Sequence, residues 1–242
     1  MTGIRIGAHR GAMAYQPENT LAAFETAIQQ QAYRIEFDIR RTRDGHLVVI
    51  HDATVDRTTD GSGAVADMDL AEIKKLRSGD QPVPTFAEAI ACMRGRARLL
   101  VEFKEGDLAE QAVREIEAAG VVEQCTLSSF HEEALIEARA YNPHIETAYF
   151  LVEPKPFDAA SVREQLGAGL LIVWPAAARP EFIADARSNG MDVRCGFRDD
   201  LTYEETRARF RQLHALGVGE FSCGRPDWIG RLIDELAAES SL

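Results

Sequence analysis

The chain has 242 residues, of which 45% are hydrophobic and 27% charged, and its formal net charge is −12. This length and apolar content allow one large core, in a single α/β barrel or in two small domains. The acidic balance, with no basic run longer than Arg40-Arg41, argues against non-specific binding of nucleic acid or of anionic membranes.

Strand-like apolar runs alternate with helix-like amphipathic runs along the whole chain. The expected strands cover residues 4–8, 34–40, 97–104, 125–130, 145–151, 170–174, 192–196 and 219–223. The expected helices cover residues 20–31, 85–93, 107–119, 132–141, 161–166, 181–189, 203–216 and 227–238. These strand–helix units predict an α/β fold, a (β/α)8 TIM barrel. An open doubly wound sheet is the alternative, but no Gly-x-Gly-x-x-Gly follows the first strand.

One segment, residues 41–84, breaks this alternation between the second strand and its helix. Asp44-Gly45 predicts a hairpin turn that leads into a strand-like run at residues 47–50. A loop rich in turn formers follows at residues 56–63, and then a short helix near residues 69–76. We expect a small insertion within a single domain of residues 1–242. In compact folds an excursion of this length is usually functional.

The four cysteines, Cys92, Cys125, Cys195 and Cys223, are widely spaced and form no Cys-x-x-Cys motif. We therefore expect reduced, mostly buried thiols rather than a disulfide framework or a zinc site. No leader-like segment precedes the first expected strand, and no apolar run approaches the ~18 residues of a membrane span. We expect no signal peptide, no stable membrane anchoring, a cytoplasmic location, and a monomer or homodimer.

Polar side chains gather where the first expected strands end. In a strand, residues two apart point to the same face. Glu36 and Asp38 therefore point to one face of their strand, as do Glu102 and Lys104. At the carboxyl end of a barrel these groups would share one site. The residues concerned are His9, Arg10, Glu36, Asp38, His51, Glu102 and Lys104.

The carboxylates of Glu36, Asp38 and Glu102 would repel one another unless a cation or protons lie among them. A hard divalent ion with oxygen ligands, Mg²⁺ or Ca²⁺, suits them better than zinc, which prefers nitrogen and sulfur. The alternative is that Glu36 and Glu102 merely pair with neighbouring Arg or Lys side chains.

The remaining groups of this set suit phosphate chemistry. Two histidines, His9 and His51, can share the roles of general base and general acid near neutral pH. Arg10 could fork onto phosphate oxygens and Lys104 could add a point charge. Gly11 would let the backbone approach a ligand closely.

The same residues form a family pattern. Six short motifs occur in order: His9-Arg10-Gly11, Pro17-Glu18-Asn19-Thr20, Glu36-Phe37-Asp38, His51-Asp52, Arg57-Thr58-Thr59 with Gly61 and Gly63, and Glu102-Phe103-Lys104. Together they make the chain resemble the glycerophosphodiester phosphodiesterase family. The likeness is close over roughly the first 105 residues, and the later part matches mainly as alternating strand–helix units.

The resemblance implies a TIM barrel with a small insertion, and hydrolysis of glycerophosphodiesters to glycerol 3-phosphate and an alcohol. It implies one divalent cation on the three carboxylates, with His9 and His51 as acid and base. By the same match, Arg10 and Lys104 would hold the phosphate, and Asn19 would also belong to the substrate-binding residues. In the mechanism usual for such folds, the neighbouring glycerol hydroxyl attacks phosphorus, and water then opens the cyclic phosphate.

The chain departs from the family pattern in its later strands. Arg194 lies in the seventh strand, where a Trp-Thr-like pair is usual, and Cys223 ends the eighth, where Thr-Asp is usual. Trp174 ends the sixth strand, where its side chain could belong to the core, to the rim of the barrel or to a wall of the substrate pocket. Arg194 could hold an anionic group or pair with a carboxylate if it points inward. These changes leave the reaction class better defined than the alcohol group.

Three other functions remain as alternatives. The first is a phospholipase D-type enzyme acting on lysophospholipids or sphingolipids, which would need an apolar entrance. The second is a non-catalytic phosphate-ester binder that has kept the pocket. The third is a metal-dependent aldolase or sugar isomerase, because a TIM barrel alone does not define a function.

Overall fold

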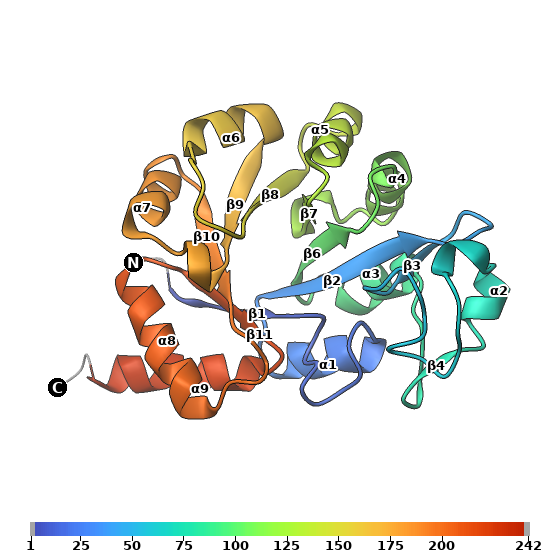
Figure 1. Ribbon diagram of the computed structural model, residues 1–242, viewed down its shortest axis with the longest axis horizontal. Helices are drawn as coiled ribbons and strands as arrows, with labels where there is room; N and C mark the ends of the chain where they lie inside the picture. The colour runs from blue at the N-terminus through green and yellow to red at the C-terminus, as the bar shows by residue number, and fades with distance from the viewer. Residues whose placement is uncertain (1–2, 240–242) are drawn as a thin grey trace.

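The computed structural model describes residues 3–239. Within that range eight parallel strands form a closed barrel, in which each strand pairs with its neighbours and the last pairs with the first (Figure 1). This confirms the predicted (β/α)8 TIM barrel. The ends of the predicted domain, residues 1–2 and 240–242, lie outside the described residues. The strands are β1 (Arg5–Ala8), β2 (Arg34–Arg41), β6 (Arg98–Phe103), β7 (Cys125–Ser129), β8 (Glu146–Leu151), β9 (Ala168–Val173), β10 (Asp192–Gly196) and β11 (Glu220–Cys223).

A helix follows every barrel strand and covers the outside of the barrel, as the ring of ribbons in Figure 1 shows. These helices are α1 (Leu21–Gln29), α3 (Phe86–Met93), α4 (Ala109–Ala118), α5 (Glu132–Tyr141), α6 (Ala159–Leu166), α7 (Pro180–Ser188), α8 (Tyr203–Ala215) and α9 (Pro226–Glu239). Short 3-10 turns cover Val122–Gln124 and Pro175–Ala177. Most element ends lie within one or two residues of the sequence prediction.

The segment between β2 and α3 projects to one side of the ring (Figure 1). β3 (Leu47–Val49) runs antiparallel to β2, as the predicted turn requires. After a 3-10 turn at Val65–Asp67 come α2 (Leu70–Ile73) and a two-residue hairpin of β4 (Arg77–Ser78) with β5 (Gln81–Pro82). The helix is shorter than predicted, and the hairpin was not predicted.

This projecting segment has a small apolar core of its own. Val48, Val55, Val65 and Ile73 are buried together there. Burying each of these side chains stabilises the segment by ~1.5–3 kcal/mol. The segment is therefore an ordered wall beside the mouth of the barrel.

Side-chain alternation along β2 separates the packing face from the functional face. Phe37 is fully buried and its ring lies 5.4 Å from that of Phe24 and 6.1 Å from that of Phe86, between the strand and its helices. Its neighbours Glu36 and Asp38 therefore point to the opposite face, into the barrel. The packing of Phe37 thus holds both carboxylates in place.

The barrel interior contains a buried ion-pair network. The Glu220 carboxylate pairs with Arg194 and lies 3.5 Å from Arg34, and all three side chains are almost fully buried. A second guanidinium nitrogen of Arg194 donates to Ser222 Oγ (2.5 Å) and to the carbonyl of Ala8 (3.0 Å). The network links β2, β10, β11 and the end of β1.

Candidate active site

Strand register brings the three predicted metal ligands together. β2 and β6 pair so that Asp38 lies directly beside Glu102, and Glu36 is two residues earlier on the same face of β2. One oxygen from each carboxylate lies within 4.8 Å of the other two, and all three residues are buried. This arrangement is the one that the sequence predicts for a cation site.

The loop after β1 brings Arg10 against the same carboxylates. Its backbone N–H donates to Glu36 Oε2 (2.8 Å) and its Nη1 donates to Glu18 Oε1 (2.8 Å). Its Nε lies 3.4 Å from Asp38 Oδ2. Arg10 and Asn19 both have positive φ, at 51° and 59°, although neither is glycine. Such backbone strain is concentrated at functional sites, where surrounding contacts maintain it.

Gly11 is required by packing within the chain. It has φ +79°, and a Cβ at this position would lie 2.7 Å from backbone and side-chain atoms of Ala23 in α1. The close approach expected for a ligand is therefore made, in this structure, to α1.

Asn19 lies behind Asp38 rather than on the open side of the site. Its Nδ2 donates to Asp38 Oδ2 (2.8 Å), its Oδ1 accepts from the Asp38 backbone N–H (3.3 Å), and only 3% of the residue is exposed. Here Asn19 orients a carboxylate; its contact with substrate stays a prediction.

Lys104 neutralises part of the carboxylate cluster. Its ammonium lies 2.9 Å from Asp38 Oδ1 and also pairs with Glu102. The ion pairing that the sequence analysis weighed as an alternative is thus present for Glu102, in addition to the convergence of three carboxylates. One lysine charge does not balance three carboxylates in a buried site.

Burial and the neighbouring charges shift the pKa values of the three carboxyls in opposite directions. Burial, with repulsion from Asp38, raises the pKa of Glu102 to about 7, and burial likewise raises the pKa of Glu36. Burial alone would also raise the pKa of Asp38, but Lys104 and Arg10 outweigh it and lower that pKa. Two of the three carboxyls therefore need additional positive charge to ionise together near neutral pH.

His51 approaches the site from the projecting segment and is held by a neighbouring carboxylate. Its Nδ1 lies 2.6 Å from Asp52 Oδ1. Arg57 binds Asp52 through two nitrogens, at 2.6 and 3.0 Å, and binds Glu18 through two contacts of 2.8 Å. Burial lowers the pKa of His51, against the opposing effect of Asp52. The sequence analysis included Arg57 in a motif but gave it no role.

His9 also has a carboxylate at Nδ1, and the sequence analysis missed it. Asp199, from the loop after β10, places Oδ2 3.5 Å from His9 Nδ1, while His9 Nε2 lies 4.0 Å from Glu36 Oε2. Burial alone would lower the pKa of His9, but Asp199 and Glu36 outweigh it and raise that pKa. No motif or periodicity marks Asp199 as a partner of a residue at the other end of the chain.

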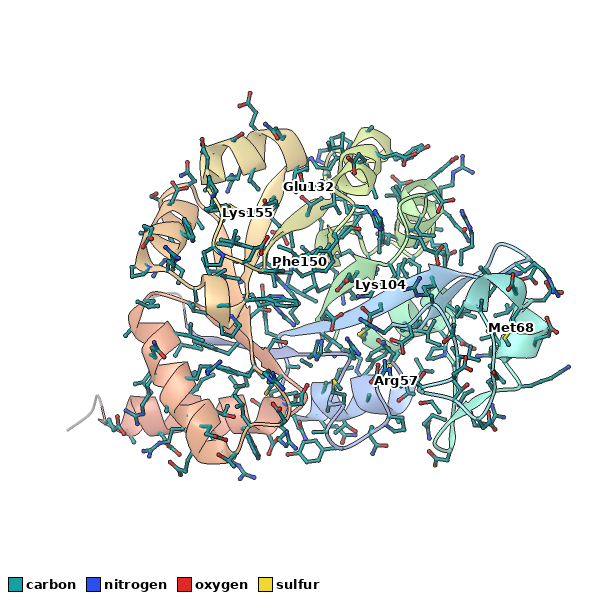
Figure 2. All side chains as sticks on the ribbon, viewed as in Figure 1. Arg57, Met68, Lys104, Glu132, Phe150 and Lys155 are labelled. Atoms are coloured by element: carbon teal, nitrogen blue, oxygen red, sulfur yellow. The ribbon has the colours of Figure 1, made fainter. Side chains whose placement is uncertain are left out.

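These groups line a cavity of about 430 Å³ at the carboxyl ends of the strands. Its charged side is formed by residues at the ends of β1, β2, β3 and β6, and its apolar side by residues at the ends of β7, β8 and β9 together with Phe197. Arg198 and Asp199, from the loop after β10, also line it. Figure 2 shows Lys104 beside β2 and β6 and Phe150 beside β8, both near the middle of the ring. The charged side includes His9, Arg10, Glu36, His51, Glu102 and Lys104. The apolar side includes Phe130, Phe150, Ile172, Trp174, Pro175 and Phe197.

The rim of the apolar side is aromatic and open. Phe130 and Trp174 are 56% and 50% exposed, and the Phe130 ring stacks on Phe150 with centroids 4.5 Å apart and planes 6° from parallel. The sequence analysis left Trp174 between core, rim and substrate wall; it is at the rim and lines the cavity. Phe130 ends a predicted strand, which was the available signal, but a strand-end aromatic is equally typical of a core.

The two residues that depart from the family pattern, Arg194 and Cys223, are both buried. Arg194 points inward and is buried in its ion pair with Glu220, at the floor of the cavity. All four cysteines are free, and Cys223 is buried with its Sγ donating to the Arg225 carbonyl (3.3 Å).

Among the described residues, no helix is long and apolar enough to cross a membrane.

A family model and several known proteins match most of this chain. The model of the glycerophosphoryl diester phosphodiesterase family matches residues 9–219. A glycerophosphodiester phosphodiesterase of Caldanaerobacter subterraneus subsp. tengcongensis is 38% identical over 165 residues, which are 61% of this chain and 68% of the relative. A putative glycerophosphodiester phosphodiesterase of Bacillus subtilis is 32% identical over 241 residues, covering 92% of this chain and 95% of the relative.

Solved structures give the same result at the level of the fold. The glycerophosphodiester phosphodiesterase of Agrobacterium tumefaciens superposes with a TM-score of 0.81 and 32% identity, over 93% of this chain and 98% of that one. A phosphodiesterase of Oleispira antarctica, solved in complex with the product sn-glycerol-3-phosphate, superposes with a TM-score of 0.82 and 28% identity, over 95% and 96% of the two chains.

Proposed function

Because this chain belongs to the glycerophosphoryl diester phosphodiesterase family, and is an enzyme of that kind, we propose that it hydrolyses small soluble glycerophosphodiesters, such as glycerophosphocholine, to glycerol 3-phosphate and an alcohol. The observation that supports this most is a cluster of three converging carboxylates, two of which line one cavity together with two histidines that each have a carboxylate near Nδ1. The related Oleispira enzyme was solved with glycerol 3-phosphate bound, which agrees with this product.

The carboxylate cluster fits a divalent cation. Asp38 Oδ1 is buried with the Lys104 ammonium 2.9 Å away, and two of the three carboxyls have raised pKa values, so the cluster has room for further positive charge. Glu36, Asp38 and Glu102 would hold the ion, and their all-oxygen set suits Mg²⁺ or Ca²⁺. Such an ion would neutralise phosphate charge and so lower the barrier to nucleophilic attack on phosphorus.

The chain's own groups supply the remaining chemistry. Arg10 and Lys104 lie at the edge of the cluster, where both would stabilise negative charge on the phosphate oxygens. One histidine would remove the proton from the glycerol hydroxyl that attacks phosphorus, and the other would protonate the departing alcohol oxygen. A cyclic phosphate and the free alcohol result; water then opens the ring, with the two proton transfers reversed.

The products identify this reaction. We expect ³¹P NMR of a glycerophosphocholine digest to show glycerol 3-phosphate, with choline released in equal amount. We expect His9→Ala and His51→Ala each to lower kcat by at least ~100-fold, the range for acid–base groups. His46→Ala is the matched control, because His46 is exposed and lies outside the cavity. Release of phosphocholine and glycerol would contradict the proposal, as would near-normal turnover in His51→Ala.

The aromatic rim favours a second candidate, a phospholipase D-type reaction on lysophospholipids. Phe130, Phe150 and Trp174 form the apolar entrance that such substrates require. Stacked rings cover each other's faces, so Phe130 and Phe150 suit an alkyl chain better than a cation held between two rings. Comparing kcat/KM for glycerophosphocholine and lysophosphatidylcholine separates the two candidates. Phe130→Ala would lower only the second value if the rim binds the chain.

A further inference from the structure

We propose that Asp199 is a positioning residue for His9: it accepts the Nδ1 proton and so directs the bare Nε2 into the cavity. This proposal rests on the proposed function in one respect: it takes His9 as a group that transfers a proton in the cavity. A neutral imidazole has one donor and one acceptor nitrogen, and the group that bonds one nitrogen determines the protonation of the other.

His9 Nδ1 needs such a partner. The atom is buried and has no hydrogen bond among the described residues, and Asp199 Oδ2, at 3.5 Å, is the oxygen that faces it. A buried nitrogen without a partner is costly, so a small shortening of this distance would stabilise the site. Hydrogen bonds between groups that transfer protons are often long in ligand-free structures and tighten when substrate binds.

The Asp199 carboxylate is itself held from the other side. Its Oδ1 accepts from the backbone N–H of Gly224 (2.5 Å), and its backbone carbonyl accepts from Arg225 (2.8 Å). A Cβ at position 224 would lie 2.7 Å from that Oδ1, so only glycine leaves room for the carboxylate. With Oδ1 occupied, Oδ2 is the atom available to His9.

The other histidine has the same arrangement. His51 Nδ1 lies 2.6 Å from Asp52 Oδ1, and Arg57 holds that carboxylate from behind. Each histidine therefore has a carboxylate at Nδ1 and leaves Nε2 for the cavity. For His51 the carboxylate comes from the next residue in sequence, and for His9 it comes from the loop after β10. Since Asp199 follows β10, it connects His9 to the half of the barrel that lacks the carboxylate cluster.

Asp199→Asn separates positioning from a purely structural role. The Gly224 N–H requires an acceptor, so it keeps the amide oxygen of the new Asn, and the amide NH₂ then faces His9 Nδ1. The loop contact survives, but the polarity at Nδ1 is reversed and the wrong tautomer is favoured. We expect kcat to fall at least ~100-fold with KM changed less than ~3-fold, as when a histidine loses its orienting carboxylate.

Two controls accompany this variant. Asp200→Asn changes the next residue in the same loop, whose side chain is exposed and pairs with exposed Arg198, and should retain wild-type turnover. His9→Ala combined with Asp199→Asn should be no slower than His9→Ala alone, because a residue that acts through His9 has no effect once His9 is gone.

¹⁵N NMR of the histidine rings reads the tautomer directly, and the signal of His9 is identified by its loss in His9→Ala. We expect an Nδ1–H tautomer in the wild-type protein and an Nε2–H tautomer in Asp199→Asn. This readout does not require turnover, so it tests the proposal even if the proposed substrate is wrong. Wild-type kcat in Asp199→Asn, or an unchanged His9 tautomer, would overturn the proposal.

Discussion

The ammonium of Lys104 lies 2.9 Å from the Asp38 carboxylate and also pairs with Glu102. A protein cation thus stands among the groups that we propose as ligands of a divalent ion. A bound ion would compete with Lys104 for the same oxygens, and the lysine would then be available to a phosphate oxygen. This relationship would connect cation binding to substrate binding.

Replacing Lys104 should therefore separate the two events. In Lys104→Met we expect tighter binding of Mg²⁺ or Ca²⁺, because a competing positive charge is lost, together with a fall in kcat/KM of ~10-fold or more, because a charge on phosphate is lost. Isothermal titration with the cation and steady-state kinetics measure the two effects. Glu102→Gln, which removes a ligand, should weaken cation binding. Equal weakening in both variants would contradict the competition.

Cation affinity should depend on pH around the pKa of Glu102. In the folded, cation-free protein this pKa is raised to about 7 from 4.5, so the folded state keeps a proton that the unfolded chain has lost. The stability from this group is thus complete below pH 4.5 and lost as pH rises through about 7. Because cation binding requires the ionised form, the affinity should rise as pH rises through about 7. Titrations at several pH values check this, and Glu102→Gln should flatten the dependence.

Arg57 connects two parts of the site through paired contacts. It binds Asp52, which holds His51, and Glu18, which holds Arg10. We expect Arg57→Ala to lower kcat/KM by ~10–100-fold, and Arg57→Lys to restore only part of it, because a single ammonium cannot form two forked pairs. Arg43→Ala is the control in the same segment, since Arg43 binds exposed Asp69 and Glu72. Equal activity in both Ala variants would contradict this role.

The ion pairs in the barrel interior should matter for stability. Glu220→Ala leaves the buried guanidinium groups of Arg34 and Arg194 without their shared carboxylate, at a cost of ~3–5 kcal/mol in the free energy of unfolding. Asp200→Ala removes an exposed pair with Arg198 and should leave the free energy of unfolding almost unchanged. Urea denaturation of the two variants measures both. Similar values would show that burial does not govern these ion pairs.

The convergence of the three carboxylates could be predicted from sequence because its signals are local and periodic. Glu36 and Asp38 share a face since the side-chain period of a strand is two, and Phe37 between them marks the packed face. Parallel pairing then places Glu102 beside Asp38. The strand–helix alternation is similarly local, and it predicted the barrel.

Other features depend on distant contacts that no local pattern records. Asp199 meets His9 only because the closed barrel brings β10 and β1 to the same rim, and the β4–β5 hairpin has strands of two residues. Gly11 was interpreted as room for a ligand, whereas the tertiary contact that requires glycine is Ala23. Phe130 could be assigned to a wall of the cavity only once its neighbour Phe150 was known.

The proposed function depends above all on cation-dependent release of glycerol 3-phosphate, which a single assay measures. Glycerophosphocholine is incubated with the enzyme, then with enzyme treated with EDTA, and then with treated enzyme supplied with Mg²⁺ or Ca²⁺. We expect release in the first case, loss in the second and recovery in the third, with no recovery in Asp38→Asn. Full release in EDTA, or no release although the cation binds, would contradict it.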